Sequence, residues 1–297
     1  MSPPVVVSTV SELRAQLHPW RAGGGGIALV PTMGALHEGH LSLVRKAAEE
    51  AERVVVSIFV NPTQFAPHED LATYPRDLAS DLRKLEGVPV DLVFAPDPAE
   101  MYPEGASTVV TVGGPANGLE SDARPHFFAG VATVVAKLLI QCAPDVAVFG
   151  EKDFQQAAVV RRLVRDLCLP VRIETLATVR EPSGLALSSR NAYLSAADRD
   201  TAATLHKAMT AAAGSISAGG NPEAALAVAR RQMESVGFTI DYLELRDAET
   251  LGAYDPSLDR PARLLAAARL SGVRLIDNIP VIKASNRGVT MAAARYT

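Results

Sequence analysis

The stretch Ile27-Ala-Leu-Val-Pro-Thr-Met-Gly-Ala-Leu-His-Glu-Gly-His40 gives the strongest indication of the fold. Its first four residues form a short apolar run typical of a buried strand, and residues 41–53 that follow have the apolar spacing of a helix. The polar part of the stretch therefore lies between a strand and its helix. In an open α/β sheet, ligands bind beyond the carboxyl ends of the strands. We expect a ligand site there.

The residue types in this stretch suit a phosphate group. A helix start offers unpaired N–H groups and the positive end of a dipole, and Gly34 and Gly39 let the backbone approach a ligand. His37 and His40 are three residues apart and share one face if the helix has begun, so both imidazoles could donate to phosphate oxygens. On spacing alone, two surface histidines are an equal alternative. The zinc motif His-Glu-x-x-His has a different spacing.

Working outward, apolar runs at residues 54–60, 90–94 and 146–149 are further strand candidates, and residues 128–142 form a mostly apolar helix. Strands that alternate with helices predict an α/β fold with a parallel sheet covered on both faces. After about residue 178 the pattern changes. Helices are expected at residues 196–218 and 222–236, and strands at 239–245 and 263–270. The prediction is a large domain, residues 1–178, and a smaller α+β domain, residues 179–297.

Bulk properties exclude several classes of protein. The formal net charge of −4 argues against a nucleic-acid binder, which would carry a basic face. No apolar run approaches the ~20 residues that cross a membrane, and residues 1–20 do not resemble a signal peptide. We therefore expect a cytoplasmic protein without nucleic-acid or membrane partners. Both cysteines, Cys142 and Cys168, have apolar sequence neighbours and are predicted to be buried free thiols.

Polar clusters follow two other predicted strands. Phe-Val-Asn-Pro-Thr-Gln-Phe65 follows one, and Phe-Gly-Glu-Lys-Asp-Phe-Gln-Gln156 follows another and opens a helix. Clusters at the same ends of parallel strands would converge on one crevice, where Lys152 suits a phosphate and Asp153 a ribose hydroxyl. A solvated helix cap is the alternative for the second cluster. A fourth polar segment, residues 183–191, suits the β- and γ-phosphates of ATP or, alternatively, only caps a helix.

Together these segments resemble the pantothenate synthetase (pantoate–β-alanine ligase) family, within the HIGH-motif nucleotidylyltransferase superfamily. The similarity runs in the family's order over most of the chain, and the matching segments are PTMGALHEGH, FVNPTQF, YPR at residues 74–76, FGEKDFQQ, LALSSRN and DYLELRD at residues 241–247. Each motif alone would be weak, whereas the set is specific.

The resemblance implies a Rossmann-like N-terminal domain, a small C-terminal lid domain and a homodimer. It implies an AMP-forming ligase that makes an amide bond in two steps. The carboxylate of pantoate first attacks the α-phosphorus of ATP and releases pyrophosphate, and the amine of β-alanine then attacks the acyl-adenylate and releases AMP. The implied small molecules are ATP, Mg²⁺, pantoate and β-alanine. Such an enzyme works by orientation and electrostatic stabilisation, without a covalent nucleophile.

The resemblance also implies roles for residues of this sequence. His40 is the principal catalytic histidine and proton donor, assisted by His37 and by Lys152 at the phosphates. Gln64 and Gln156 hold pantoate, with Gln64 also near β-alanine, and Asp81 contributes to the magnesium site. The residues implied to bind ATP are Met33, Gly34, Ala35, Leu36, His37, Glu38, Gly39, His40, Gly150, Glu151, Lys152, Asp153, Val179, Leu187, Ser188, Ser189 and Arg190.

One segment departs from the family pattern. The family usually has Arg-Pro-x-His-Phe before the long apolar helix, whereas this chain has Arg124-Pro-His-Phe-Phe, so His126 stands one residue early and Phe127 takes its place. We therefore do not assign His126 to the pantoate pocket.

Three alternative functions stay open at this point. Another nucleotidylyltransferase of the superfamily would keep the HEGH and SSR elements but not both glutamines. An NAD-dependent oxidoreductase would need Gly-x-Gly-x-x-Gly after the first strand, but the glycine run at residues 23–26 precedes it. A non-catalytic nucleotide-binding protein would bind ATP without pantoate-dependent pyrophosphate exchange.

Overall fold

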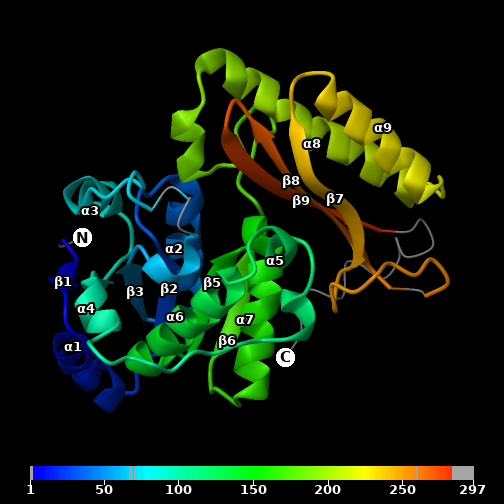
Figure 1. The fold of residues 1–297 in the computed structure, drawn as a ribbon. Helices are drawn as coiled ribbons and strands as arrows, with labels where there is room; N and C mark the ends of the chain where they lie inside the picture. The colour runs from blue at the N-terminus through cyan, green and yellow to red at the C-terminus, as the bar shows by residue number, and fades with distance from the viewer. Residues whose placement is uncertain (1–2, 67–68, 70, 259, 283–297) are drawn as a thin grey trace. The chain divides into compact units, whose positions relative to one another are not determined.

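The computed structural model describes residues 3–66, 69, 71–258 and 260–282. The chain divides into two compact units, Met1–Val179 and Arg180–Thr297. Each unit has its own sheet, as the ribbon in Figure 1 shows, and its own apolar core.

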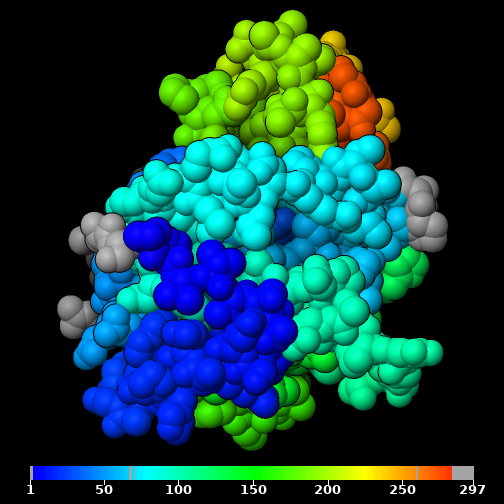
Figure 2. All heavy atoms as spheres, turned by 90° about the vertical axis from the view of Figure 1, so that its left-hand side faces the viewer, coloured from blue at the N-terminus to red at the C-terminus, as the bar shows by residue number. Residues whose placement is uncertain are grey.

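The first unit contains a six-stranded sheet in the order β1-β4-β3-β2-β5-β6, and all its paired strands are parallel. The edge strand β1 is partly open to solvent, with Val5 47% and Val6 43% exposed. Figure 2 faces this edge, where the dark blue N-terminal residues form part of the surface. The strands are β1 (Val5–Val7), β2 (Ile27–Thr32), β3 (Arg53–Ile58), β4 (Leu92–Phe94), β5 (Val146–Gly150) and β6 (Arg172–Leu176).

Alternating residues of the central strands supply two separate apolar clusters, one on each face of this sheet. Leu29 and Val55 belong to the cluster that includes residues of α1, α6 and α7, whereas Ala28 and Val54 belong to the one that includes α2 and α3. A parallel sheet needs such cover because both of its faces are apolar. The helices are α1 (Val10–Ala22), α2 (Glu38–Glu50), α3 (Leu78–Leu85), α4 (Pro98–Met101), α5 (Glu120–Ala123), α6 (Phe127–Cys142) and α7 (Phe154–Asp166).

The second unit has a three-stranded antiparallel sheet in the order β7-β8-β9, and two helices pack on it (Figure 1). Its core is made mostly of leucine and alanine side chains from both helices and all three strands, and it includes Met209, Met233 and Leu264. Pro280 lies in β9, which is an edge strand. Edge strands tolerate proline, which has no backbone N–H to donate. The elements are α8 (Ala196–Ser217), α9 (Pro222–Glu234), β7 (Thr239–Asp247), β8 (Ala262–Leu270) and β9 (Val273–Val281).

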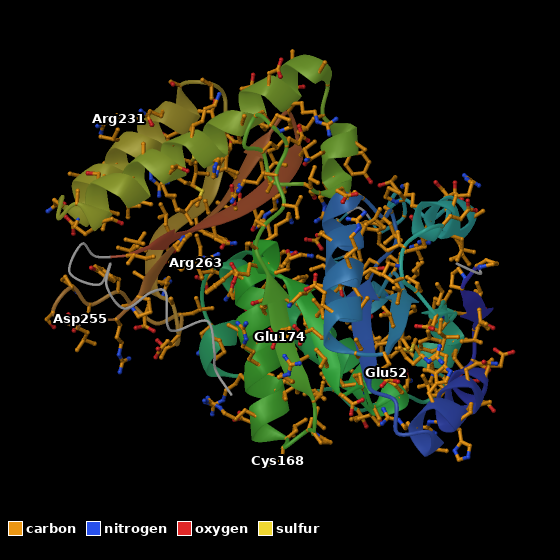
Figure 3. The ribbon with its side chains drawn as sticks, turned by 180° about the vertical axis from the view of Figure 1, so that it is seen from behind. Glu52, Cys168, Glu174, Arg231, Asp255 and Arg263 are labelled. Carbon is orange, nitrogen blue, oxygen red and sulfur yellow. The ribbon has the colours of Figure 1, made fainter. Side chains whose placement is uncertain are left out.

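The predicted fold class is confirmed: a Rossmann-like parallel sheet with helices on both faces and a smaller α+β part. The prediction of two buried thiols is wrong for Cys168, which is exposed, whereas Cys142 is buried. Cys168 lies in the turn that follows α7, and its φ is 50°. Figure 3 shows Cys168 at one end of the first unit. None of the helices among the described residues is long and apolar enough to span a membrane.

Candidate functional site

The three polar clusters of the first unit follow three neighbouring strands. Strand β2 pairs with β3 on one side and with β5 on the other, and all three are parallel. Their carboxyl ends therefore lie at the same edge of the sheet. Chain connections leave β2 in one direction and β5 in the other, which is the switch point where open α/β sheets bind ligands. The polar residues predicted to form a crevice thus share one edge.

A tight turn joins β2 to α2. Gly34 and Ala35 both have left-handed backbone conformations, with φ of 78° and 49°. Helix α2 begins at Glu38, with His37 at its N-cap, so the helix starts three residues earlier than the sequence predicted. The rings of His37 and His40 lie side by side with their centroids 4.1 Å apart. The turn therefore brings both imidazoles to the start of α2, where the helix N–H groups favour an anion.

A backbone hydrogen bond fixes the protonation state of His40. The N–H of His37 donates to Nδ1 of His40 at 3.3 Å, so a neutral His40 ring carries its proton on Nε2. Burial, the neighbouring His37 and the positive charges of Lys152 and Lys84 lower the pKa of His40 to about 3. Burial and the same two lysines lower the pKa of His37 to about 4. Both rings are thus neutral at pH 7, and His40 offers a hydrogen bond rather than a free proton.

The site has a positive charge that does not come from histidine. Lys152 and Lys84 both act electrostatically on the histidine pair. Lys152 lies in the short 3-10 turn Glu151–Asp153 after β5, and its Nζ is 3.7 Å from Oδ1 of Asp153. Lys84 comes from α3, and no motif in the sequence pointed to it. The ammonium group of Lys152 beside neutral imidazoles suits a polyphosphate, whereas the Nζ of Lys84 donates to the carbonyl of Leu36 at 2.7 Å.

The side chain of Gln64 is held in one orientation after β3. Its Oε1 accepts from Nδ2 of Asn61 at 3.2 Å, and its Nε2 points at the sulfur of Met33 at 2.9 Å. Asn61 is 1% exposed and also accepts from Tyr102 Oη at 2.8 Å. Asn61 is therefore a site residue that the sequence analysis missed. Its place before Pro62, as an Asn-Pro turn signal, could have drawn attention to it.

A glycine of α6 lets this turn sit against the helix. The carbonyl of Gly130 accepts from Nδ2 of Asn61 at 3.1 Å. A Cβ at Gly130 would lie only 2.5 Å from the carbonyl oxygen of Thr63, so no larger residue fits here without movement. The close approach of α6 thus positions the segment that carries Gln64.

The cluster after β5 contains two glutamines with different surroundings. Gln155 is 4% exposed and is bonded to the backbone of Pro115, Gly118 and Glu120, so it holds a neighbouring loop. Gln156, the glutamine implied to bind pantoate, is half-buried on the first turn of α7. Gly150 ends β5 at the same edge of the sheet, and Val179 is half-buried at the end of the first unit.

Asp81 has contacts that differ from those of a metal ligand. It is 2% exposed, and its two carboxylate oxygens accept the backbone N–H groups of Ala35 and Leu36 at 2.9 and 2.8 Å. Over the described part of the chain, no group of three or more His, Cys, Asp or Glu side chains could hold a metal ion. The contacts of Asp81 are those of an anchor for the turn.

The residues predicted to wrap the phosphates, Leu187, Ser188, Ser189 and Arg190, belong to the second unit. Ser188 caps the 3-10 turn Ser189–Tyr193, and its Oγ accepts from the N–H of Arg190 at 3.3 Å. Leu187 and these three residues are half-buried. Asn191, which is 3% exposed, donates to the carbonyl of Ala186 at 3.0 Å and so closes the segment on itself.

The shifted histidine of the sequence is exposed. His126 stands at the N-cap of α6, and the ring that follows it, Phe127, lies under the guanidinium of Arg124 at 3.9 Å. The structure therefore gives no reason to place His126 in the site.

Comparisons with known proteins identify the family. The sequence profile of a family described as pantoate-beta-alanine ligase matches residues 5–280. A pantothenate synthetase from Mesorhizobium japonicum is 56% identical over 282 residues, which are 95% of this chain and 99% of that protein. One from Caulobacter vibrioides is 54% identical over 95% of this chain and its own full length.

Solved structures give the same result. A pantothenate synthetase from Thermus thermophilus superposes with a TM-score of 0.87 at 48% identity, over 94% of this chain and 99% of that one. A pantoate-beta-alanine ligase from Francisella tularensis, solved with an ATP compound and β-alanine, superposes with a TM-score of 0.79 at 34% identity, over 93% of this chain and 97% of that one.

Proposed function

This chain belongs to the pantoate–β-alanine ligase family, and we propose that it joins pantoate to β-alanine in an ATP-dependent, AMP-forming reaction. The proposal rests above all on one observation: the ends of β2, β3 and β5 bring the histidine pair, Gln64 and Lys152 to one edge of the sheet. Another nucleotidylyltransferase activity is less well supported, because the relatives that match over the whole chain are pantothenate synthetases.

The reaction has two balanced steps. A carboxylate oxygen of pantoate forms a bond to the α-phosphorus of ATP, and the bond from that phosphorus to pyrophosphate breaks. The amine of β-alanine then bonds to the carbonyl carbon of the pantoyl-adenylate, AMP leaves with one carboxylate oxygen, and the amine loses a proton. Neither step needs a covalent enzyme intermediate, so the protein has only to orient the substrates and to stabilise charge.

The histidine pair would act on the phosphates as neutral hydrogen-bond donors. With Nδ1 of His40 occupied by the N–H of His37, its Nε2–H is the group available to a phosphate oxygen. This refines the role of His40 from a proton donor to a hydrogen-bond donor. His37 would assist, since its Nδ1 is buried without a hydrogen-bond partner in the described structure. Lys152 would supply the positive charge that stabilises departing pyrophosphate.

The remaining ATP-binding roles are proposals of the same kind. Residues 33–40 would line the nucleotide, residues 150–153 would hold its phosphates and, through Asp153, its ribose, and Val179 would lie near adenine. In the second unit, Leu187, Ser188, Ser189 and Arg190 would contribute phosphate ligands, and this unit would act as the lid.

Gln64 and Gln156 would bind pantoate through its hydroxyl and carboxylate oxygens. The fixed orientation of the Gln64 amide supports this proposal, since a side chain held by Asn61 loses little freedom when it binds. Gln64 would also lie near β-alanine.

Magnesium would enter as the MgATP complex. Mg²⁺ is commonly held by substrate phosphates and water with few protein ligands. We also propose that the protein forms a homodimer and that it works in the cytoplasm.

The test is pantoate-dependent exchange of labelled pyrophosphate into ATP. We expect exchange with pantoate and without β-alanine, and pantothenate only when all three substrates are present. Exchange driven by another carboxylate and not by pantoate would contradict the substrate assignment. Binding of ATP with no exchange at all would instead favour a non-catalytic nucleotide-binding protein.

A further inference from the structure

Both carboxylate oxygens of Asp81 accept hydrogen bonds from the backbone of the protein. Asp81 reaches from α3 to the turn before the histidine pair, where its oxygens accept the N–H groups of Ala35 and Leu36 at 2.9 and 2.8 Å. Asp81 is 2% exposed, so these bonds form away from water and are stronger than their surface equivalents.

Lys84 holds the same turn from its other side. One helical turn after Asp81, its Nζ donates to the carbonyl of Leu36 at 2.7 Å and lies 4.0 Å from Oδ1 of Asp81. The N–H and the C=O of Leu36 are therefore both bonded to side chains of α3. Leu36 itself is 2% exposed and immediately precedes His37.

The backbone of the turn needs such support. Ala35 has a φ of 49°, a conformation that non-glycine residues adopt at a cost and keep only when their surroundings hold them there. At Gly34, with a φ of 78°, a Cβ would lie 2.9 Å from Oδ2 of Asp81. The absence of a side chain at Gly34 thus makes room for the carboxylate of Asp81.

We propose that Asp81 and Lys84 are positioning residues for the adenylation step: they fix the turn at residues 34–36 and, through it, the directions of His37 and His40. This proposal rests on the proposed function. The histidines must point their N–H groups at phosphate oxygens within a few tenths of an ångström, and a small misplacement in such a site lowers the rate strongly. A clamp from another helix provides that precision without touching the substrates.

The test compares the same amide substitution at two aspartates of one helix. Asp81→Asn keeps the shape but turns an N–H donor toward a backbone N–H. Asp77→Asn is the control, because Asp77 caps α3 through Oδ1 to the N–H of Ser80, and asparagine caps helices equally well. The readouts are kcat and KM for pantoate-dependent pyrophosphate exchange, the dependence on Mg²⁺, and hydrogen exchange of the Ala35 and Leu36 amides.

For Asp81→Asn we expect a fall in kcat of about 10- to 100-fold, with the KM for pantoate within about 2-fold of wild type. The concentration of Mg²⁺ for half-maximal rate stays unchanged, and the two amides exchange faster while protection elsewhere is kept. Asp77→Asn stays within about 2-fold of wild type. Lys84→Met, which keeps the side-chain stem, gives a smaller fall in kcat of about 3- to 10-fold and decides the question if Asp81→Asn does not fold.

Three results would overturn the proposal. An unchanged kcat in Asp81→Asn and Lys84→Met would remove the clamp from the reaction. Rescue of Asp81→Asn by high Mg²⁺ would make Asp81 a metal ligand. Loss of protection throughout the first unit, in proportion to lost activity, would make its role merely structural. If wild type itself shows no exchange, the proposed function fails, whereas the protection of the two amides still tests the clamp.

Discussion

The turn at residues 34–36 in the first unit and the segment at residues 180–191 in the second are both irregular, and each is tied down by a buried aspartate. In the first, Asp81 bonds directly to backbone N–H groups of the turn. In the second, Asp277 binds the guanidinium of Arg180 at 2.7 and 2.8 Å, at the base of the segment, while Asn191 shapes its interior.

This difference separates two ways of holding a segment that we propose to bind phosphate. A carboxylate that accepts backbone N–H groups, as Asp81 does, fixes the conformation of the turn itself. Its substitution should therefore lower the rate of catalysis. A carboxylate that pairs with another side chain, as Asp277 does with Arg180, fixes only where the segment starts. Its substitution should therefore lower mainly the stability of the protein. The variants below, in order of decreasing expected effect, test this contrast.

The largest expected effect is on turnover, from His40→Ala. Removing the Nε2–H group that would stabilise charge on the phosphates should lower turnover about 10²-fold or more, with the fold intact. Steady-state pantothenate formation and circular dichroism measure the two properties. His18→Ala, at an exposed histidine of α1, is the control and should leave both unchanged. Near-wild-type turnover of His40→Ala would remove this residue from the mechanism.

Asp277→Asn should act on stability instead. The carboxylate is 3% exposed, so its loss leaves Arg180 poorly paired and should lower the free energy of unfolding by about 2–3 kcal/mol. Urea unfolding measures this. The control is Asp166→Asn, which breaks an exposed ion pair with Arg162 and should change stability by less than about 1 kcal/mol. Equal effects of the two substitutions would show that the pair at Arg180 does not anchor the segment.

Gly130→Ala should disturb the pantoate side of the first unit. A methyl group 2.5 Å from the carbonyl oxygen of Thr63 must displace the turn that carries Gln64, at a cost of about 1–3 kcal/mol in stability. We also expect a higher KM for pantoate. Gly214→Ala, in α8 with no atom within 4 Å of the new methyl, is the matched control and should be neutral or stabilising. A stable Gly130→Ala with an unchanged KM would contradict the close packing.

The most gradual effect is on the pH dependence of stability. The pKa of His40 in the folded protein, about 3, lies below the ordinary value of 6.5. Between these values the unfolded chain binds a proton that the folded protein does not, so stability should fall as pH falls below 6.5. Relative to His40→Gln, the wild type should lose up to about 1.4 kcal/mol more per pH unit. Urea unfolding from pH 7.5 to 4.5 tests this, and parallel curves would contradict a buried neutral ring.

The sequence predicted the parts of the fold that have a local pattern. β2, β3 and β5 are continuous apolar runs, and the helices of the second unit show clear periodicity between Gly and Pro breakers. β6 was missed because Arg-Ile-Glu-Thr-Leu is a partly exposed edge strand with little apolar pattern. β9 was missed because Asp277, Asn278 and Pro280 interrupt its apolar residues.

The candidate site divides in the same way. His37, His40, Gln64 and Lys152 stand in motifs, so the sequence indicated them. The contacts that hold them in place were not indicated by the motifs, even though Asn61 lies in the same motif as Gln64. The bond from Asp81 to Ala35 joins residues 46 positions apart, and that from Asn61 to Gly130 joins residues 69 apart. Such contacts exist only after the chain has folded, so the sequence could not show that Asp81 bonds to the backbone of the turn.

The measurement that tests the central claim most directly is the transfer of one carboxylate oxygen from pantoate to AMP. The reaction is run with ATP, β-alanine and pantoate labelled with ¹⁸O in both carboxylate oxygens, and the products are analysed by mass spectrometry. We predict one ¹⁸O atom in AMP and one in the amide carbonyl of pantothenate, because the carboxylate attacks the α-phosphorus and AMP leaves with that oxygen. Label in pyrophosphate or phosphate, or none in AMP, would contradict activation of pantoate as an acyl-adenylate.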